Sequence, residues 1–302
     1  MADNHMNNSN QMNSIENARK YGTKLWKKKV RKFFNNKLAV FGLTVVLIFV
    51  ILMVGAPLFT KWDPNEPNFK AKLLGPTAEH YFGTDSLGRD LFARILYGGR
   101  TSVLIAVVSS LIGSTIGTIL GAIGGYFEGF VDKLLVRISE IVSCFPQLIL
   151  VLIVVAFIGP GTWNLILIFS ITGWTGTFRM VRSEFIARKE ETYVKVCEAF
   201  GMSHVKIMFS QILPAVLTTV IVTVTINIPG YVMQEAGLSF LGFGVPMNTP
   251  TWGTMLNAAK ASNILINNPH CWLVPGIAIC LFVLAVNFFG DGLRDVMDPR
   301  QQ

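Results

Sequence analysis

VLIAVVSSLIGSTIGTILGAIGG, residues 103–125, is a predominantly apolar stretch without a single charged side chain. A helix rises about 1.5 Å per residue, so the stretch is long enough to cross the roughly 30 Å hydrocarbon core of a bilayer. Small residues recur along it at every fourth position: Ser109, Gly113, Gly117, Gly121 and Gly125. Such a stripe lets another helix approach closely, so the stretch predicts a transmembrane helix packed tightly against a neighbour.

The whole chain has the composition of a membrane protein. Of its 302 residues, 51% are hydrophobic and only 15% are charged, which disfavours an ordinary soluble globular domain. Six stretches are apolar enough to cross a bilayer: residues 38–60, 103–125, 141–159, 163–178, 215–238 and 272–290. The sequence therefore predicts an all-α integral membrane protein with six transmembrane helices, the fourth being short and interrupted by Gly173 and Gly176.

The distribution of positive charge predicts the orientation. Most Lys and Arg residues fall in the segments on one side of the predicted spans: residues 1–37, 126–140, 179–214 and 291–302. The positive-inside rule then places both termini in the cytoplasm and residues 61–102 outside the cell membrane. The net charge of +8 follows from this sidedness and from the anionic inner leaflet, so no nucleic-acid partner is expected.

The N-terminal arm, residues 1–37, divides into two parts. Its first 20 residues are rich in Asn, Met and Ser, which predicts disorder. Residues 24–37, KLWKKKVRKFFNNK, interleave basic and apolar side chains at helical spacing. This pattern predicts an amphipathic helix that lies on the inner surface of the membrane in contact with membrane lipid. Its place directly before a span favours this membrane interpretation over a nucleic-acid-binding arm.

The sequence lacks the residues that several kinds of functional site require. The four Cys residues form no Cys-x-x-Cys pair and the four His residues are scattered, so neither a metal site nor a disulfide framework is predicted. No Ser/His/Asp set or pair of membrane aspartates occurs, so no catalytic residue is assigned and an intramembrane enzyme is disfavoured. A Gly-x-x-x-x-Gly-Lys-Ser/Thr loop is also missing, so the chain is expected to carry no cofactor of its own, and ATP would have to act through another polypeptide.

The stretch FGTDSLGRD, residues 82–90, opens a charged segment before the second predicted span. From residue 87 onward, one helical face is apolar, with Leu87, Leu91, Phe92, Ile95 and Leu96, and the other is charged, with Arg89, Asp90 and Arg94. The pattern predicts an amphipathic helix on the outer membrane surface, with residues 84–86 supplying its N-cap. A solvated face with internal Arg and Asp pairs explains the same composition.

The fifth predicted span carries a polar stripe. Thr219, Thr223, Asn227, Tyr231 and Glu235 follow one another at intervals of four, with Pro229 between them. Polar side chains are costly in lipid, so this face is expected to look into the helix bundle. It then either lines a water-filled path for a polar solute or makes hydrogen bonds between helices, and both interpretations remain open. For Glu235, as for Glu140, a position that reaches the membrane interface is the simpler expectation.

Residues 191–214, ETYVKVCEAFGMSHVKIMFSQILP, form the long connection between the fourth and fifth predicted spans. They predict a helix to Phe200, a break at Gly201, a second helix capped by Ser203 and a stop at Pro214. Two short helices joined at a glycine would project from the membrane as a rigid knob.

This segment resembles the EAA loop of ABC importer permeases, whose coupling helix docks on a cytoplasmic ATPase. Four more motifs resemble the C-type membrane subunits of dipeptide and oligopeptide permeases: FGTDSLGRD at 82–90, EAGLSFLGFGVP at 235–246, TWGTM at 251–255 and GDGLRDVMDPR at 290–300. The resemblance extends from about residue 30 to the C-terminus. It departs at the EAA triplet, where Lys195, Val196 and Cys197 stand in register, and at Gln211, which replaces an isoleucine.

The resemblance implies a type I importer permease fold with a cytoplasmic coupling helix, and a function in ATP-driven import of dipeptides or oligopeptides. The implied partners are a homologous second permease, two ATPase subunits that bind ATP and Mg, an extracellular solute-binding protein and the peptide substrate. Coupling to the ATPases would run through residues in the 193–211 stretch: Tyr193, Lys195, Cys197, Glu198, Gly201, Ser203, His204 and Gln211. Asp85, Arg89 and Asp90 would lie in an external segment that touches the binding protein or the sister permease.

Three other functions compete with this interpretation. Nickel or a metal chelate is an alternative cargo, because related importers carry it and the spans do not select the solute. A channel or energy-independent carrier gains no support, since the sequence lacks an inverted repeat and the knob would have no purpose. A membrane enzyme lacks a catalytic set.

Overall fold

The computed structural model describes residues 30–297. Within this range the chain is built from helices and loops, without β-strand elements. Residues 30–35 are helical, and the elements that follow are α2 Lys37–Val54, α3 Ala56–Phe59, η1 Phe69–Ala71, α4 Leu91–Phe127, α5 Gly129–Cys144, α6 Gln147–Ile158, α7 Thr162–Thr172, α8 Trp174–Lys189, α9 Thr192–Ala199, α10 His204–Lys206, η2 Ile207–Ile212, α11 Leu213–Leu241, α12 Trp252–Ala258, α13 Ser262–Asn267 and α14 His270–Met297. The sequence prediction of an all-α protein is confirmed.

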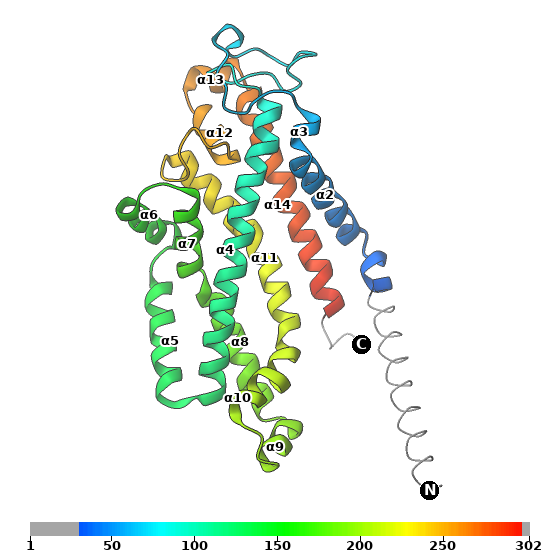
Figure 1. Ribbon diagram of the computed structural model, residues 1–302, viewed down its shortest axis with the longest axis vertical. Helices are drawn as coiled ribbons and strands as arrows, with labels where there is room; N and C mark the ends of the chain where they lie inside the picture. The colour runs from blue at the N-terminus through cyan, green and yellow to red at the C-terminus, as the bar shows by residue number, and fades with distance from the viewer. Residues whose placement is uncertain (1–29, 298–302) are drawn as a thin grey trace.

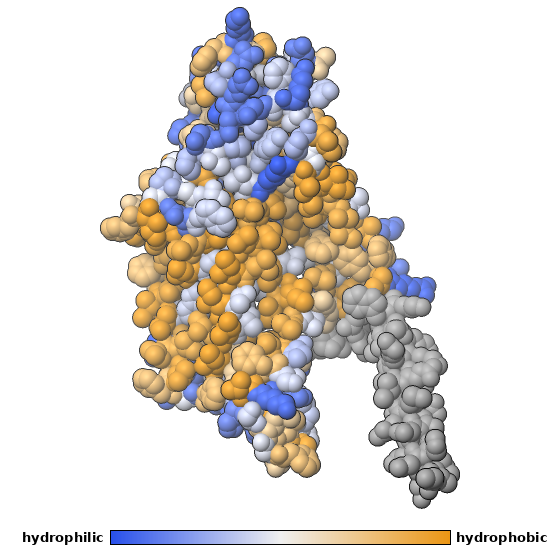
Figure 2. Space-filling view, in the orientation of Figure 1, coloured by the Kyte–Doolittle hydropathy of each residue, from blue (hydrophilic) through white to orange (hydrophobic). Residues whose placement is uncertain are grey.

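The helices form an elongated bundle with two different ends (Figure 1). One end carries residues 60–90 together with α12 and α13, and it is called the loop end below. The opposite end carries α9 and α10 and is called the knob end. On the face shown in Figure 2, a broad band of apolar side chains covers the bundle between the two ends, whereas polar residues gather mainly at the ends. This distribution is that of a protein embedded in a bilayer, where lipid-facing side chains are apolar.

Helix α4 runs along the centre of the bundle and contacts α8 through the glycine stripe. A Cβ atom placed on Gly117 would lie 2.6 Å from the carbonyl oxygen of Trp174, and one on Gly125 would lie 2.6 Å from that of Arg182. The backbones of α4 and α8 are therefore too close for any larger side chain at these positions. The predicted tight helix packing is confirmed, and α8 is the partner.

Helix α2 packs along α14, again at a glycine. A Cβ atom on Gly42 would lie 2.8 Å from the backbone nitrogen of Phe289. The helix begins at Lys37 because the side chain of Asn36 accepts hydrogen bonds from the backbone N–H groups of Leu38 and Ala39. The predicted amphipathic helix at 24–37 is described only from residue 30, where it continues to residue 35. Residues 24–29 and the predicted disordered first 20 residues lie outside the described part.

Six transmembrane helices are not confirmed. Among residues 30–297, four helices are long and apolar enough to span a membrane: Lys37–Val54, Leu91–Phe127, His204–Leu241 and His270–Met297. A fifth span exists if α5 and α6, which are bent by 88° relative to each other, count together.

The predicted third and fourth spans are the ones that differ, and each has a local cause. The third is bent because Phe145, with φ −91° and ψ 135°, is extended before Pro146, and a proline disfavours helical backbone at the preceding residue. The fourth is divided at Gly173 into α7 and α8. A tyrosine from α11 occupies the space beside this glycine, where the hydroxyl of Tyr231 would contact any added Cβ. Tertiary packing therefore leaves no room for a side chain at the position where the helix is interrupted.

Candidate functional site

The charged residues around the start of α4, from Asp85 to Arg94, are buried, which corrects the predicted amphipathic helix. Helix α4 begins at Leu91, and its N-cap is Asp90, whose Oδ1 accepts a 2.7 Å hydrogen bond from the backbone of Ala93. Residues 84–86 therefore do not cap it. The side chain of Arg94, expected on an exposed face, has no solvent-accessible surface. The predicted pattern was wrong because residues 60–90 fold over the start of α4 and cover its charged face.

Asp85, Arg89 and Asp90 lie together, but they form the inside of the loop. Asp85 and Arg89 make an ion pair at 2.7 Å, and the Oδ2 atom of Asp90 lies 2.8 Å from Nδ1 of His80. The three predicted contact residues are only 4%, 5% and 3% exposed. They have almost no surface to offer a partner directly, so their role in this structure is to fix the loop over α4.

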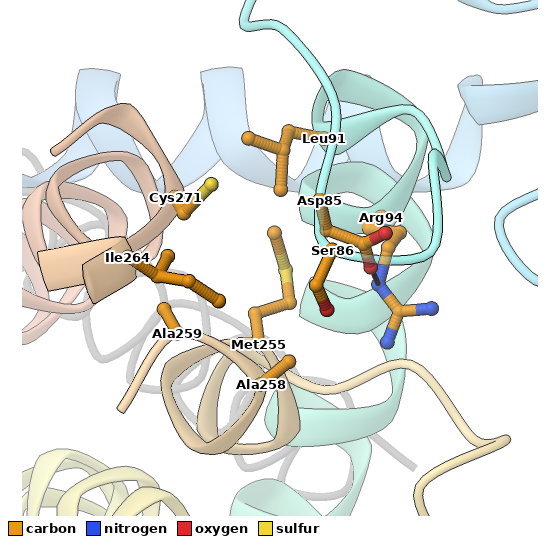
Figure 3. Close-up of a pocket in the computed structure, with 9 residues that line it drawn as sticks. All are labelled: Asp85, Ser86, Leu91, Arg94, Met255, Ala258, Ala259, Ile264 and Cys271. Atoms are coloured by element: carbon orange, nitrogen blue, oxygen red, sulfur yellow. Dashed lines mark ion pairs between the residues drawn. The ribbon is translucent and has the colours of Figure 1, made fainter. Parts of the chain in front are cut away.

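Figure 3 shows where this loop meets the other elements of the loop end. Asp85 and Ser86 face α12 and the start of α14 across a small enclosed cavity of about 10 Å³, which Met255 and Cys271 also line. The Arg94 guanidinium donates to the carbonyl oxygen of Pro64 at 2.8 Å. The cavity is about the size of one water molecule, so it cannot hold a transported solute.

The knob has the geometry of two helices joined at a glycine. Gly201 has φ +74°, in the left-handed region where a side chain is strained. Its N–H donates to the carbonyl oxygen of Glu198 at 2.9 Å, and the N–H of Met202 donates to that of Cys197 at 3.1 Å. This pair of bonds is a Schellman motif, which ends α9 and turns the chain sharply. The predicted break at Gly201 is confirmed.

The second half of the knob differs from its prediction. Ser203 is the residue before α10, but its side chain makes no capping hydrogen bond. The predicted stop at Pro214 is wrong, because Pro214 lies in the first turn of α11, where a proline is tolerated. Residues 204–241 therefore run as one long helical segment, with a π-helical stretch at Ile207–Ile212. Helix α10 is thus continuous with the span formed by α11.

Tyr126, at the end of α4, connects the two halves of the knob. Its hydroxyl donates to Oε1 of Glu198 at 3.2 Å and lies 2.9 Å from Nδ1 of His204. Below it, Val194 and Ile207 are fully buried in a core that also contains Tyr126. These hydrogen bonds and this apolar core thus hold the knob against the end of α4. Sequence reasoning missed Tyr126, whose signal was its place directly after the last glycine of the stripe.

The outer face of the knob exposes apolar side chains outside the apolar band. Phe200 at the turn is 88% exposed, and Val196, Val205 and Phe209 are exposed as well. Exposed apolar patches of this kind are typical of interaction surfaces. The predicted coupling residues all belong to this unit: Tyr193, Lys195, Glu198, Gly201, Ser203 and His204 are exposed, and Cys197 and Gln211 are half-buried.

An exposed ion pair lies at the start of α9. Lys195 Nζ lies 2.8 Å from Oε2 of Glu190 on the exposed side of the knob. The hydrogen bond from Lys195 and its positive charge lower the pKa of the Glu190 carboxyl, and the same contact raises the pKa of Lys195. Both groups therefore stay charged at neutral pH.

The polar stripe of α11 faces other helices of the same chain over part of its length. Thr223 donates to the carbonyl oxygen of Thr219 at 2.9 Å and lies 3.0 Å from Sδ of Met180 on α8. The ring of Tyr231 is buried against Phe169 of α7, with 5.5 Å between the centroids. Asn227 is half-buried. Packing between helices therefore explains Tyr231 and Thr223.

Glu235 is fully buried, so the expectation that it reaches the membrane interface is wrong. Its carboxylate accepts hydrogen bonds from Ser102 of α4 at 2.8 Å and from Ser239 at 2.7 Å. Ser102 in turn accepts a hydrogen bond from the backbone N–H of Trp252, the first residue of α12. Glu235 thus joins α4, α11 and α12 into one polar cluster. By contrast, Glu140 is exposed and pairs with Arg137 at 2.9 Å.

The chain matches known proteins over almost all of its length. Residues 113–302 match the binding-protein-dependent transport system inner membrane component, and residues 24–76 match the N-terminal TM domain of oligopeptide transport permease C.

Three relatives illustrate the similarity. The dipeptide transport system permease protein DppC of Alkalihalophilus pseudofirmus is 38% identical over 277 residues, which cover 92% of this chain and 90% of the relative. The oligopeptide transport system permease protein OppC of Bacillus subtilis is 34% identical over 285 residues, 94% and 93% of the two chains. The glutathione transport system permease protein GsiD of Salmonella typhimurium is 38% identical over 276 residues, 91% and 90% of the two chains.

The helical bundle, the projecting knob and these matches agree. They describe a non-catalytic, multi-pass permease subunit of an ABC importer in the inner membrane, with a type I permease fold. The chain belongs to the family of binding-protein-dependent transport system inner membrane components, as a C-type permease of the dipeptide and oligopeptide group.

Proposed function

We propose that this chain forms half of the pathway through which an ATP-driven importer moves short peptides into the cell. A related permease forms the other half, an extracellular binding protein delivers the peptide, and two ATPase subunits bind ATP and Mg. The observation that carries the proposal is the knob, because its exposed apolar face supplies a docking surface and its buried side is fixed to α4 and α11.

The coupling step follows from this geometry. When the ATPases close, the knob moves with them, because Phe200 and its neighbours dock on their surface. Tyr126 passes the movement to α4, and the continuous segment 204–241 passes it to α11. The membrane helices then exchange an inward-open for an outward-facing arrangement, as in other transitions where packed elements move as rigid bodies.

The pathway itself includes part of the polar stripe. The side chains of Tyr231 and Glu235 are buried in contacts within this subunit, so they act as packing residues. Asn227 makes no side-chain hydrogen bond to any residue in the range 30–297, and Thr219 offers only its backbone carbonyl. These two half-buried residues are therefore the members of the stripe with polar groups available to a solute.

Short peptides are the favoured cargo. The three relatives described above are named for dipeptides, oligopeptides and glutathione, which favours peptides over nickel or a metal chelate. The proposed orientation places the knob and both termini in the cytoplasm. In support, the two ends of the described chain are neighbours, since the Lys32 ammonium donates to the carbonyl oxygen of Asp295 at 2.8 Å.

The test uses the complete complex in proteoliposomes, with binding protein, ATP and a labelled dipeptide. Gly201→Val introduces a β-branched side chain at φ +74°, which distorts the turn of the knob. Gly276→Val is the matched control, because Gly276 is a glycine of α14 with open space around its Cβ position. We expect Gly201→Val to lower uptake per ATP hydrolysed by about tenfold or more, and Gly276→Val to leave it unchanged.

Two results would contradict the proposal. Normal coupling in Gly201→Val refutes the role of the knob. Uptake of nickel without uptake of any dipeptide by the unmodified complex refutes the cargo.

A further inference from the structure

Two cavities at the loop end meet at one side chain, Phe92. The first is a groove of about 270 Å³ between the last turns of α2 and the first turns of α4 and α14. All of its lining residues are apolar, among them Met53, Leu96 and Ile277. It lies on α2, α4 and α14, three of the four helices in the described part of the chain that are long and apolar enough to span a membrane, and its lining is as apolar as the hydrocarbon of a bilayer.

The second cavity is a recess of about 420 Å³ between α3 and the loop that follows it. Lys61, Trp62, Glu79 and Tyr81 line it together with Phe92. The Lys61 ammonium lies 5.1 Å from the centre of the Trp62 ring, and the Trp62 indole donates to the carbonyl oxygen of Glu79 at 3.2 Å. Trp, Tyr and Lys in this arrangement are typical of the boundary between hydrocarbon and headgroups.

The recess carries one available charge of each sign. Within residues 30–297, neither the Lys61 ammonium nor the Glu79 carboxylate takes part in an ion pair. The other carboxylate, Asp90, already caps α4 and pairs with His80. An occupant of the recess would therefore meet a cation and a carboxylate beside aromatic rings, and the ring of Phe92 borders both the recess and the apolar groove.

We propose that the groove and the recess together bind one phospholipid of the outer leaflet, with phosphatidylethanolamine as the preferred lipid. An acyl chain lies in the groove, the phosphate contacts Lys61, and the headgroup ammonium contacts Glu79. The assignment of the outer leaflet rests on the proposed orientation, in which residues 60–90 are outside the cell.

The charges select among lipids. Phosphatidylglycerol has a net negative charge and no ammonium group, so it would leave Glu79 unpaired. Phosphatidylcholine has a quaternary ammonium, which cannot donate a hydrogen bond to a carboxylate, whereas the primary ammonium of phosphatidylethanolamine can. The bound lipid would fill the space between α2, α3 and the first turns of α4 and α14, and would contact all four helices.

The test measures lipid retention directly. The assembled complex is purified from nanodiscs that contain equal amounts of phosphatidylethanolamine, phosphatidylcholine and phosphatidylglycerol, transferred to detergent and analysed by native mass spectrometry. We expect phosphatidylethanolamine to be retained about tenfold over each of the other two, a ratio that corresponds to one charge-assisted hydrogen bond.

The variants separate the groove from the recess. Ile277→Trp fills the groove and abolishes retention, whereas Leu284→Trp, on the same helix but outside the groove, does not. The two wild-type side chains are similarly exposed, at 53% and 49%, so both variants are expected to fold, and Leu281→Trp is a second groove variant. Glu79→Gln removes the preference among lipids, and Lys61→Gln lowers retention of all three.

Three outcomes would overturn the inference: retention in proportion to the bulk lipids, a preference for phosphatidylglycerol, or unchanged retention in both groove variants. The last would also result if a helix of the sister permease covered the groove. Because retention is measured without transport, this test can fail while the proposed import function stands, and the converse is equally possible.

Discussion

Replacing Gly117 with alanine is expected to separate α4 from α8. The added Cβ would lie 2.6 Å from the carbonyl oxygen of Trp174, 2.8 Å from Cβ of Thr177 and 2.9 Å from the backbone nitrogen of Phe178. Two of these three atoms belong to the backbone of α8, so no side-chain rotation relieves the clash. The helices must move apart until the contact reaches an ordinary van der Waals distance, a displacement of roughly 0.8 Å in a tightly packed interface.

The size of the effect follows from two opposing terms. Overpacking a well-packed interface costs about 1–3 kcal/mol. Alanine is a better helix former than glycine, which offsets about 1 kcal/mol of that cost. We therefore expect Gly117→Ala to lower the free energy of unfolding by up to about 2 kcal/mol. The matched control is Gly113→Ala, where the nearest atom is 3.4 Å away and the substitution should be neutral or stabilising by up to about 1 kcal/mol.

Thermal unfolding of the purified full-length protein in detergent distinguishes the two variants. With an unfolding entropy of about 2.1 cal/mol/K per residue, a change of 1 kcal/mol shifts the midpoint of a 302-residue protein by somewhat less than about 2 °C, so Gly117→Ala should melt below Gly113→Ala. Equal melting temperatures for the two variants would refute the close approach of α4 and α8 at Gly117.

Two further predictions concern buried ionisable residues. Glu235→Leu leaves the hydroxyl of Ser102 without its acceptor and should destabilise the protein by about 1–3 kcal/mol. Glu235→Gln keeps an acceptor for this hydroxyl and should cost less, so equal melting temperatures for the two variants would argue against the polar cluster. Asp85→Ala removes the counterion of buried Arg89 and should lower the free energy of unfolding by about 3–5 kcal/mol. The measurement is the rate of proteolysis within residues 60–90, which should rise. A variant that resists the protease yet loses uptake would instead indicate that Asp85 contacts a partner directly.

The sequence predicted the features that depend on local composition. A predominantly apolar stretch must be helical in a bilayer, because no water is present to satisfy its backbone polar groups. A small-residue stripe at intervals of four is a property of one helix face, so the stripe that includes Gly117, Gly121 and Gly125 identified the tight interface without its partner. The turn at Gly201 was also predictable, because a glycine between two helical patterns is the usual residue for a left-handed C-terminus.

The structure corrected predictions that depend on contacts between distant segments. The periodicity around Arg89 and Arg94 was that of an exposed amphipathic helix, but residues 60–90 cover that face. The stripe ending at Glu235 was compatible with a pathway or with packing, and the hydrogen bond from Ser102, 133 residues earlier, decided for packing at that position. Tyr126 carried no motif, and its importance appeared only when Glu198 and His204 were placed on either side of it.

The sequence by itself determined that the chain is a helical membrane protein with a glycine-jointed knob, since hydrophobic length and backbone conformation are encoded residue by residue. Only the tertiary structure decided which charges are buried, where the third and fourth spans break, and which polar groups are used inside the subunit. The burial of a side chain depends on what lies over it, and for Arg94 and Glu235 the covering or bonding groups come from other segments of the fold.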